Sequence, residues 1–174
     1  NLLNNLNINK VKKFIYIASS TCYGIPKKYP TKENEKINTK YPYALTKFLG
    51  EKMVMHWAKV FNMPNLSFRF FNVYGLRSRT TGAYGAVFGV FLAQKLAGKP
   101  LTIVGNGKQT RDFVHVKDVV DAIIKSLTNK NARGQIINIG SGKPEQIKNV
   151  IGLIRNKIKR GYPQFGKIKL RSDE

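Results

Sequence analysis

The chain has 174 residues, of which 42% are hydrophobic and 11% aromatic, and its formal net charge at pH 7 is +22. This length and composition predict a globular protein with a hydrophobic core and exclude an intrinsically disordered chain. Because Cys22 is the single cysteine, the sequence also excludes an intrachain disulfide framework and a multi-cysteine metal site.

The positive charge has two interpretations. A strongly basic surface could bind nucleic acid or an anionic surface. However, most of the basic residues are lysines, which lie toward the two ends of the chain, and no lysine occurs between Lys59 and Lys95. Asparagine and isoleucine are also abundant. Biased coding composition accounts for this pattern, so we expect no nucleic-acid partner. No long apolar run or signal peptide occurs, which predicts no membrane partner and a cytoplasmic location.

Strand-like and helix-like patterns alternate along the chain. Residues 11–18 (VKKFIYIA) are dense in β-branched and aromatic side chains, which is typical of a central parallel strand. The other predicted elements are the tail of a helix at 1–9, a loop at 25–40, a helix at 43–61, a strand at 65–71, a helix at 87–97, a strand at 101–104, an extended segment at 111–115, a helix at 116–127, a strand at 135–139, a helix at 145–157 and a strand at 167–170. This alternation predicts an α/β fold with a mainly parallel sheet.

The helix at 116–127 is strongly amphipathic. Its predicted buried side consists of Val119, Val120, Ile123, Ile124 and Leu127.

Tyr43 and Lys47 begin the helix that follows Pro42. Residues four apart share one helix face. A phenol, with a pKa near ~10, is a poor base at neutral pH. A lysine ammonium nearby favours the phenolate and lowers that pKa. The pair could therefore exchange a proton with a substrate hydroxyl.

Four motifs follow one another along the sequence. They are SSTCYG at 19–24, PYALTK at 42–47, RFFNVYG at 69–75 and GNGKQTRDF at 105–113. In this order they resemble the extended short-chain dehydrogenase/reductase family, specifically its NAD-dependent nucleotide-sugar epimerases and dehydratases, of the kind that includes UDP-hexose 4-epimerases. The resemblance covers nearly the whole chain.

The resemblance implies the C-terminal part of a Rossmann-type doubly wound parallel sheet, interleaved with a smaller substrate-binding lobe. The Rossmann part would comprise 1–75 and 111–140, and the lobe 76–110 and 141–174. The family's glycine-rich fingerprint, Gly-x-x-Gly-x-x-Gly, binds the cofactor pyrophosphate, and it is missing from the sequence. We therefore expect an N-terminally truncated fragment that lacks roughly the first hundred residues, binds NAD poorly and is inactive alone.

The resemblance also implies the catalytic roles. Tyr43 would be the base and acid, and Lys47 would hold the nicotinamide ribose and lower the pKa of Tyr43. Ser19 would hydrogen-bond the sugar hydroxyl that is oxidised, with Ser20 as the alternative if the register shifts by one residue. Tyr43, Lys47 and the backbone at Phe70 would contact NAD. No metal site is expected.

The resemblance places further residues at the nucleotide sugar. Asn72 would contact the diphosphate, although a strand-end turn is an alternative role for it. Arg111 would grip a phosphate, for which a guanidinium fork is well shaped. The implied substrate-binding residues are Ser19, Ser20, Asn72, Val87, Phe88, Arg111, Arg171 and Glu174.

The two residues after Ser19 discriminate between the reactions of the family. The 4,6-dehydratases usually have Asp and Glu there, and the decarboxylases usually have Glu at the second position, whereas this chain has Ser20 and Thr21. The resemblance thus favours C4 epimerisation of a UDP-hexose or UDP-hexuronate through a transient 4-keto intermediate. A dehydratase, decarboxylase or reductase of the family stays open, as does a basic nucleic-acid-binding module. The resemblance also implies a homodimer through the helix that carries Tyr43 and the truncated helix before it.

Overall fold

The computed structural model describes residues 2–6, 10–26, 28–80, 87–157 and 163–168, the last of these by backbone alone. The chain forms two compact units. Unit 1 consists of Asn1–Phe71 and Asp118–Ile139, and unit 2 of Asn72–Lys117 and Gly140–Glu174.

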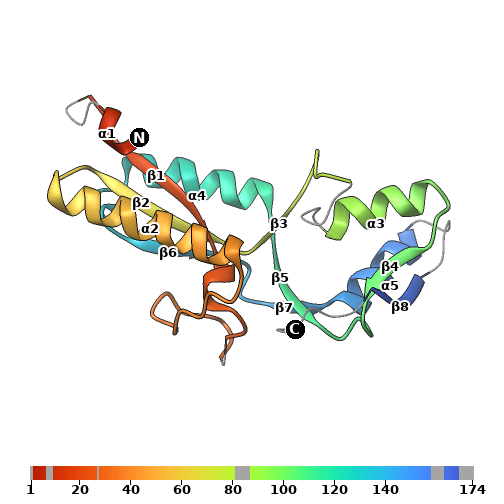
Figure 1. The fold of residues 1–174 in the computed structure, drawn as a ribbon. Coiled ribbons are helices and arrows are strands. Elements are labelled where there is room, and N and C mark those ends of the chain that lie inside the picture. Colours follow the sequence, from red (N-terminus) through yellow and green to blue (C-terminus); the bar gives the residue numbers. More distant parts are fainter. Residues whose placement is uncertain (1, 7–9, 27, 81–86, 158–162, 169–174) are drawn as a thin grey trace. The chain divides into compact units, whose positions relative to one another are not determined.

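Unit 1 is built on three parallel strands in the order β1-β2-β6 (Figure 1). The strands are β1 Phe14–Ser19, β2 Asn65–Phe70 and β6 Ile136–Ile139. Strand β2 is central, and its burial reflects this position, because five of its six residues are buried. Strand β1 pairs with β2 along one edge, and no strand in the described part of the chain pairs with its other edge.

Two helices cover opposite faces of this sheet (Figure 1). They are α2, Pro42–Val60, and α4, Val116–Thr128. Leu66 and Phe68 of β2 pack with Ile123 of α4. The alternate residues Ser67 and Arg69 bond to Glu51 of α2. The period of two along β2 therefore separates an apolar face from a polar one.

Short helical segments complete unit 1. They are α1 Leu2–Asn5, η1 Ser20–Tyr23 and η2 Lys130–Ala132. Between η1 and α2 the chain forms no helix or strand over the described residues, as expected for 25–40.

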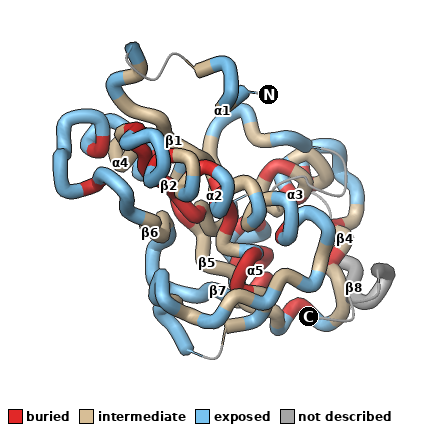
Figure 2. The backbone as a smooth tube through the Cα atoms, turned by 60° about the vertical axis from the view of Figure 1, so that its left-hand side comes forward, coloured by how far each residue is buried: buried red, intermediate tan, exposed pale blue. Residues whose placement is uncertain are grey.

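In its described residues, unit 2 contains two small sheets and two helices. Strand β5 lies between β3, which is parallel to it, and β7, which is antiparallel. Strand β4 pairs in parallel with β8. The core gathers apolar side chains of α3, β4 and α5, including Phe91, Leu101 and Ile151. Buried stretches of α5 are red in Figure 2. The elements are β3 Asn72–Tyr74, α3 Val87–Leu96, β4 Leu101–Val104, β5 Thr110–His115, β7 Pro144–Gln146, α5 Ile147–Lys157 and β8 Pro163–Ile168.

The structure confirms the predicted α/β fold with mainly parallel strands. Gly98 lies just after the end of α3. This glycine has φ +67°, and the amide of Lys99 donates to the carbonyl of Gln94 at 2.8 Å. Such a left-handed residue after a helix favours glycine.

Three predicted elements are corrected. The motif from Asn72 forms its own strand, β3, paired with β5 rather than extending β2. Strand β7 at 144–146 was missed, because three mostly exposed residues with a proline carry no alternating pattern. The last strand begins at Pro163 instead of Lys167.

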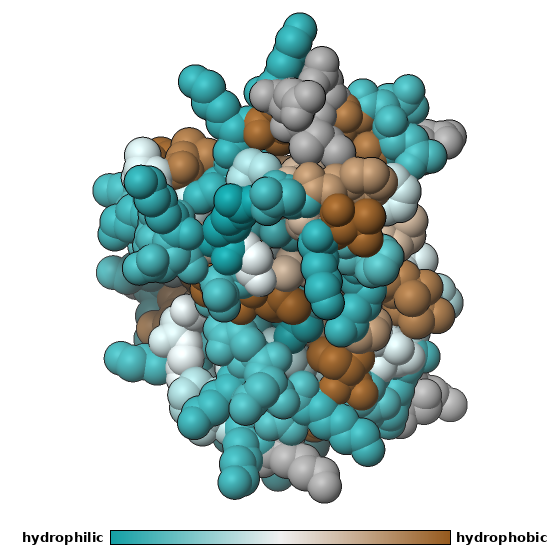
Figure 3. Space-filling model, turned by 90° about the vertical axis from the view of Figure 1, so that its left-hand side faces the viewer, coloured by the Kyte–Doolittle hydropathy of each residue, from teal (hydrophilic) through white to brown (hydrophobic). Residues whose placement is uncertain are grey.

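The predicted buried side of α4 is also partly wrong. Val119 is buried, but Val120, Ile124 and Leu127 are exposed. The sheet covers only one row of apolar side chains on the helix, the row that contains Val119. The neighbouring row, Val120, Ile124 and Leu127, lies outside the contact with the sheet. Apolar side chains at the surface are not unusual here, since hydrophobic patches interrupt a mainly hydrophilic face in Figure 3.

Candidate active site

The carboxyl ends of the three strands of unit 1 lie at one edge of the sheet. Ser19 ends β1 and pairs with Phe70, which ends β2, and Phe70 pairs with Ile139, which ends β6. Parallel α/β sheets bind their ligands at this edge. The structure thus brings together two residues predicted from the sequence, Ser19 and Phe70.

Helix α2 begins beside this edge. Pro42 occupies the first turn, where its fixed φ favours helix and its missing N–H costs no hydrogen bond. Tyr43 is exposed, and Lys47 follows one turn later. The Lys47 ammonium donates to the carbonyl oxygen of Ile17 at 2.9 Å, so α2 is bound directly to β1 two residues before Ser19.

Tyr16 forms a second contact between β1 and α2. Its hydroxyl donates to the Lys47 carbonyl at 3.3 Å. A Cβ on Gly50 would lie 2.1 Å from the Tyr16 hydroxyl oxygen, so the absence of a side chain at Gly50 lets the ring fit under the helix. Burial raises the pKa of Tyr16, and the charges of Glu51 and Tyr43 raise it further.

Ser19 is buried and caps η1. Its Oγ accepts hydrogen bonds from the Thr21 amide at 3.3 Å and from the Thr21 hydroxyl at 2.9 Å. With its lone pairs engaged in this way, the Ser19 hydroxyl is oriented to donate its own proton. Ser20, the alternative residue, is half-buried in the first position of η1.

The predicted substrate residues Asn72, Val87, Phe88 and Arg111 lie in unit 2. The Asn72 side chain donates to the Asp112 carbonyl at 3.1 Å. Phe88 packs on Tyr74, with ring centroids 4.7 Å apart, and Val87 packs against the unit 2 core.

Arg111 lies on β5 and donates to the Thr110 carbonyl at 2.9 Å. Arg171 and Glu174 lie outside the described residues.

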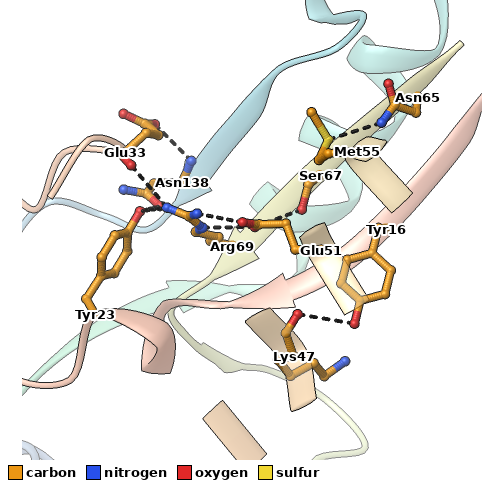
Figure 4. Close-up of polar contacts among 10 residues, drawn as sticks. All are labelled: Tyr16, Tyr23, Glu33, Lys47, Glu51, Met55, Asn65, Ser67, Arg69 and Asn138. Atoms are coloured by element: carbon orange, nitrogen blue, oxygen red, sulfur yellow. Dashed lines mark hydrogen bonds and ion pairs between the residues drawn. The ribbon is translucent and has the colours of Figure 1, made fainter. Parts of the chain in front are cut away.

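Reasoning from the sequence missed a buried polar network centred on Arg69 (Figure 4). Arg69 binds Glu51 of α2 and Tyr23 of η1. A signal was available, because Glu51 lies four residues after Lys47 and Tyr23 four residues after Ser19. Hydrogen bonds to Glu51 and Tyr23 raise the pKa of Arg69, although burial alone would lower it.

A second missed feature is Asp112, whose carboxylate accepts three hydrogen bonds. The donors are the Ser141 amide and hydroxyl, both at 2.7 Å, and the Gly142 amide at 2.8 Å. Asp112 thus holds the turn between β6 and β7.

Cys22 is buried, and burial raises the pKa of its thiol to about 11. It is not an activated nucleophile. In the described part of the chain, no three His, Cys, Asp or Glu side chains group together as metal ligands. Nor is any helix of that part long and apolar enough to cross a membrane.

The chain matches the family described as "NAD dependent epimerase/dehydratase family" over residues 1–140. Its relatives include a UDP-glucose 4-epimerase of Mycolicibacterium smegmatis, 35% identical over 76% of this chain and 42% of the relative. A UDP-N-acetyl-alpha-D-glucosaminuronate decarboxylase of Bacillus cytotoxicus is 33% identical over 80% and 44% of the two chains. A dTDP-4-dehydro-6-deoxyglucose reductase of Escherichia coli is 31% identical over 90% and 49%.

Solved structures show the same fold. A UDP-glucuronic acid 4-epimerase from Bacillus cereus, in complex with UDP-glucuronic acid and NAD, aligns with a TM-score of 0.83 and 34% identity over 95% of this chain and 51% of that one. A UDP-glucose 4-epimerase from Thermotoga maritima, with UDP-glucose, aligns with a TM-score of 0.87 and 27% identity over 99% and 55%. The Rossmann-type fold is confirmed. The chain spans about half the length of the relatives it matches.

The residues present fit one part of an NAD site. Lys47 is bound at the carboxyl end of β1, where a dinucleotide approaches a parallel sheet. The glycine-rich segment that binds the pyrophosphate does not occur in the sequence.

Proposed function

Because the chain belongs to the NAD dependent epimerase/dehydratase family, we propose that the whole protein epimerises a nucleotide sugar at C4. The substrate is a UDP-hexose or a UDP-hexuronate, and the reaction passes through a transient 4-keto sugar. The observation that supports the proposal most is the attachment of Lys47 to β1, which holds the first turns of α2 beside the strand that ends at Ser19.

Each residue has a distinct role in this proposal. Tyr43 accepts the proton of the sugar 4-hydroxyl and later returns it. Lys47 contributes a positive charge near the phenol, which favours its deprotonated form. Ser19 donates a hydrogen bond to the oxygen at C4. Bound NAD supplies reversible acceptance of hydride from the sugar carbon.

The same site could serve another reaction, since the relatives include a decarboxylase and a reductase. Elimination of water needs a carboxyl acid and base beside the sugar. The segment after Ser19 offers hydroxyls at Ser20 and Thr21 instead, and the Thr21 hydroxyl is engaged with Ser19. This arrangement favours epimerisation over dehydration or decarboxylation.

The test is product analysis with the whole protein. Nuclear magnetic resonance should show a mixture of two C4 epimers, without loss of water or carbon dioxide and without net oxidation. Tyr43→Phe should lower kcat by at least about a thousandfold, because it removes the group that transfers the proton. Thermal unfolding of the variant should stay unchanged, since the Tyr43 side chain is exposed. Near-normal turnover of the variant would refute the assignment.

We also propose that the whole protein is a cytoplasmic homodimer through α2. Leu45, Leu49, Met53 and Val60 are exposed on this helix. They recur at nearly helical spacing, which gives α2 a second apolar row that an isologous partner helix could cover. Sedimentation of the whole protein should give twice the monomer mass, and Leu49→Lys should give monomers. A wild-type monomer would contradict this.

A further inference from the structure

We propose that Arg69 is a positioning residue, which fixes the segment carrying Ser19 relative to the helix carrying Tyr43 and Lys47. The inference rests on the proposed function, because those two segments share the work of proton transfer in it. Arg69 itself touches no reacting atom in this proposal.

The first attachment is to α2. Arg69 lies on β2, and its Nε and Nη2 atoms donate to the two carboxylate oxygens of Glu51 at 2.9 and 2.6 Å (Figure 4). Both side chains are almost completely buried. A bidentate pair of hydrogen bonds fixes the orientation of the two side chains as well as the distance between them. Because Glu51 is one turn beyond Lys47, the bond fixes the rotation of α2 about its own axis.

The second attachment is to η1. The Nη1 atom of Arg69 donates to the Tyr23 hydroxyl at 2.7 Å, and the guanidinium carbon lies 4.9 Å from the centre of the Tyr23 ring. Tyr23 is the last residue of η1, the short helix that Ser19 caps. One guanidinium therefore holds the chain segments of Ser19 and Tyr43 at once.

Further hydrogen bonds close the network around Tyr23. Its hydroxyl donates to Asn138 of β6 at 2.8 Å. Asn138 in turn donates to the Thr31 carbonyl at 2.9 Å, and Arg69 also donates to the Glu33 carbonyl at 3.1 Å. A fully bonded buried network is rigid, whereas a partly bonded one is costly.

Stability alone is a weak explanation for this arrangement. A buried ion pair is often no more stabilising than apolar side chains of the same volume, because both charges lose their hydration. Geometry is a better explanation here, since a misplacement of about 1 Å in a catalytic site can lower the rate by about a hundredfold. The network joins the two segments in which such precision matters.

The decisive variant is Tyr23→Phe, prepared in the whole protein. It removes the bond from Arg69 to η1 but leaves the Arg69–Glu51 pair intact. The matched control is Ser67→Ala, which removes another hydrogen bond to the Glu51 carboxylate, of 3.1 Å, without affecting η1. Tyr23→Phe should lower kcat by about ten- to a hundredfold with KM changed by less than about twofold. Ser67→Ala should leave both constants within about twofold.

Amide hydrogen exchange of the same proteins supplies a readout independent of activity. Tyr23→Phe should speed the exchange of residues 19–24, and Ser67→Ala should not. An unchanged kcat in Tyr23→Phe, or equal losses in both variants, would overturn the proposal. If the wild-type protein epimerises no nucleotide sugar, the proposed function fails, and the exchange of residues 19–24 alone then decides whether the network holds η1.

Discussion

Thr21 shows how a single hydroxyl can orient Ser19, the serine that we propose for catalysis. It donates to Ser19 Oγ through its amide and through its side chain. In the sequence, Thr21 was informative only because it stands where dehydratases and decarboxylases of the family usually have Glu. Its contact with Ser19 depends on the turn of η1 and could not be predicted from spacing.

Thr21→Val keeps the shape and the amide but removes the hydroxyl donor. We expect kcat of the whole protein to fall by about five- to tenfold, the effect of one lost hydrogen bond. Thr21→Ser, which retains a hydroxyl, should restore most of the rate. Steady-state kinetics of the two variants checks this, and a fully active Thr21→Val protein would contradict it.

Cys22 allows a test of burial through pH. Since its pKa is raised to about 11 from an ordinary 9.0, the thiol stays protonated in the folded protein at pH 8. The thiolate is the reactive species, so reaction with an aromatic disulfide should be about a hundredfold slower than in the urea-unfolded chain. The rate should rise as the pH approaches 11. A native rate equal to the unfolded one at pH 8 would show that Cys22 is accessible.

At the scale of elements, the packing of α2 on β1 depends on a small residue. Gly50→Ala would place a Cβ 2.1 Å from the Tyr16 hydroxyl oxygen and 2.8 Å from its ring carbon. Either the half-buried Tyr16 side chain or the helix must therefore shift. We expect unfolding free energy to fall by about 1–3 kcal/mol.

Gly152→Ala is the matched control, because this glycine also lies inside a helix and its added Cβ meets nothing within 4 Å. It should raise the unfolding free energy by up to about 1 kcal/mol, as alanine is the better helix former. Urea unfolding of the two variants measures both effects. Destabilisation by both, or by neither, would contradict the packing described for Gly50.

Elements with a strong periodic pattern were predictable. The helix at Tyr43 and the strand at Leu101 were predicted within a residue or two of their observed ends. Strand β7 and the exposed row of α4 were not predictable, because a three-residue strand has no period and an amphipathic pattern does not say how wide a face is covered. For the site, the pair Tyr43 and Lys47 was predicted from its spacing together with the motifs around it, and its role stays a prediction. Glu51 and Tyr23 lie four residues after Lys47 and Ser19, but their convergence on Arg69 could not be predicted, because the partners of Arg69 come from three separate segments.

At the scale of the molecule, the chain carries the residues that we propose for proton transfer, whereas the glycine-rich pyrophosphate segment does not occur in its sequence. We expect calorimetry of the isolated 174-residue chain to show NAD⁺ binding weaker than about 1 mM, since most of the dinucleotide contacts in such folds come from that segment. The whole protein serves as the positive control. Micromolar binding by the isolated chain would contradict the expectation.

Strand β1 has one edge without a strand partner among the described residues, and its sequence FIYIAS is uncharged. Such an edge offers a row of backbone donors and acceptors to any other copy of the chain. Lys12, two residues before β1, is exposed. Its charge can oppose the pairing of another chain with this edge, as charges that flank aggregation-prone segments do.

The net charge of +22 makes copies of the chain repel one another. Salt weakens this repulsion, since the screening length is only about 10 Å at 0.1 M. Colloidal stability of the isolated chain should therefore decrease with ionic strength.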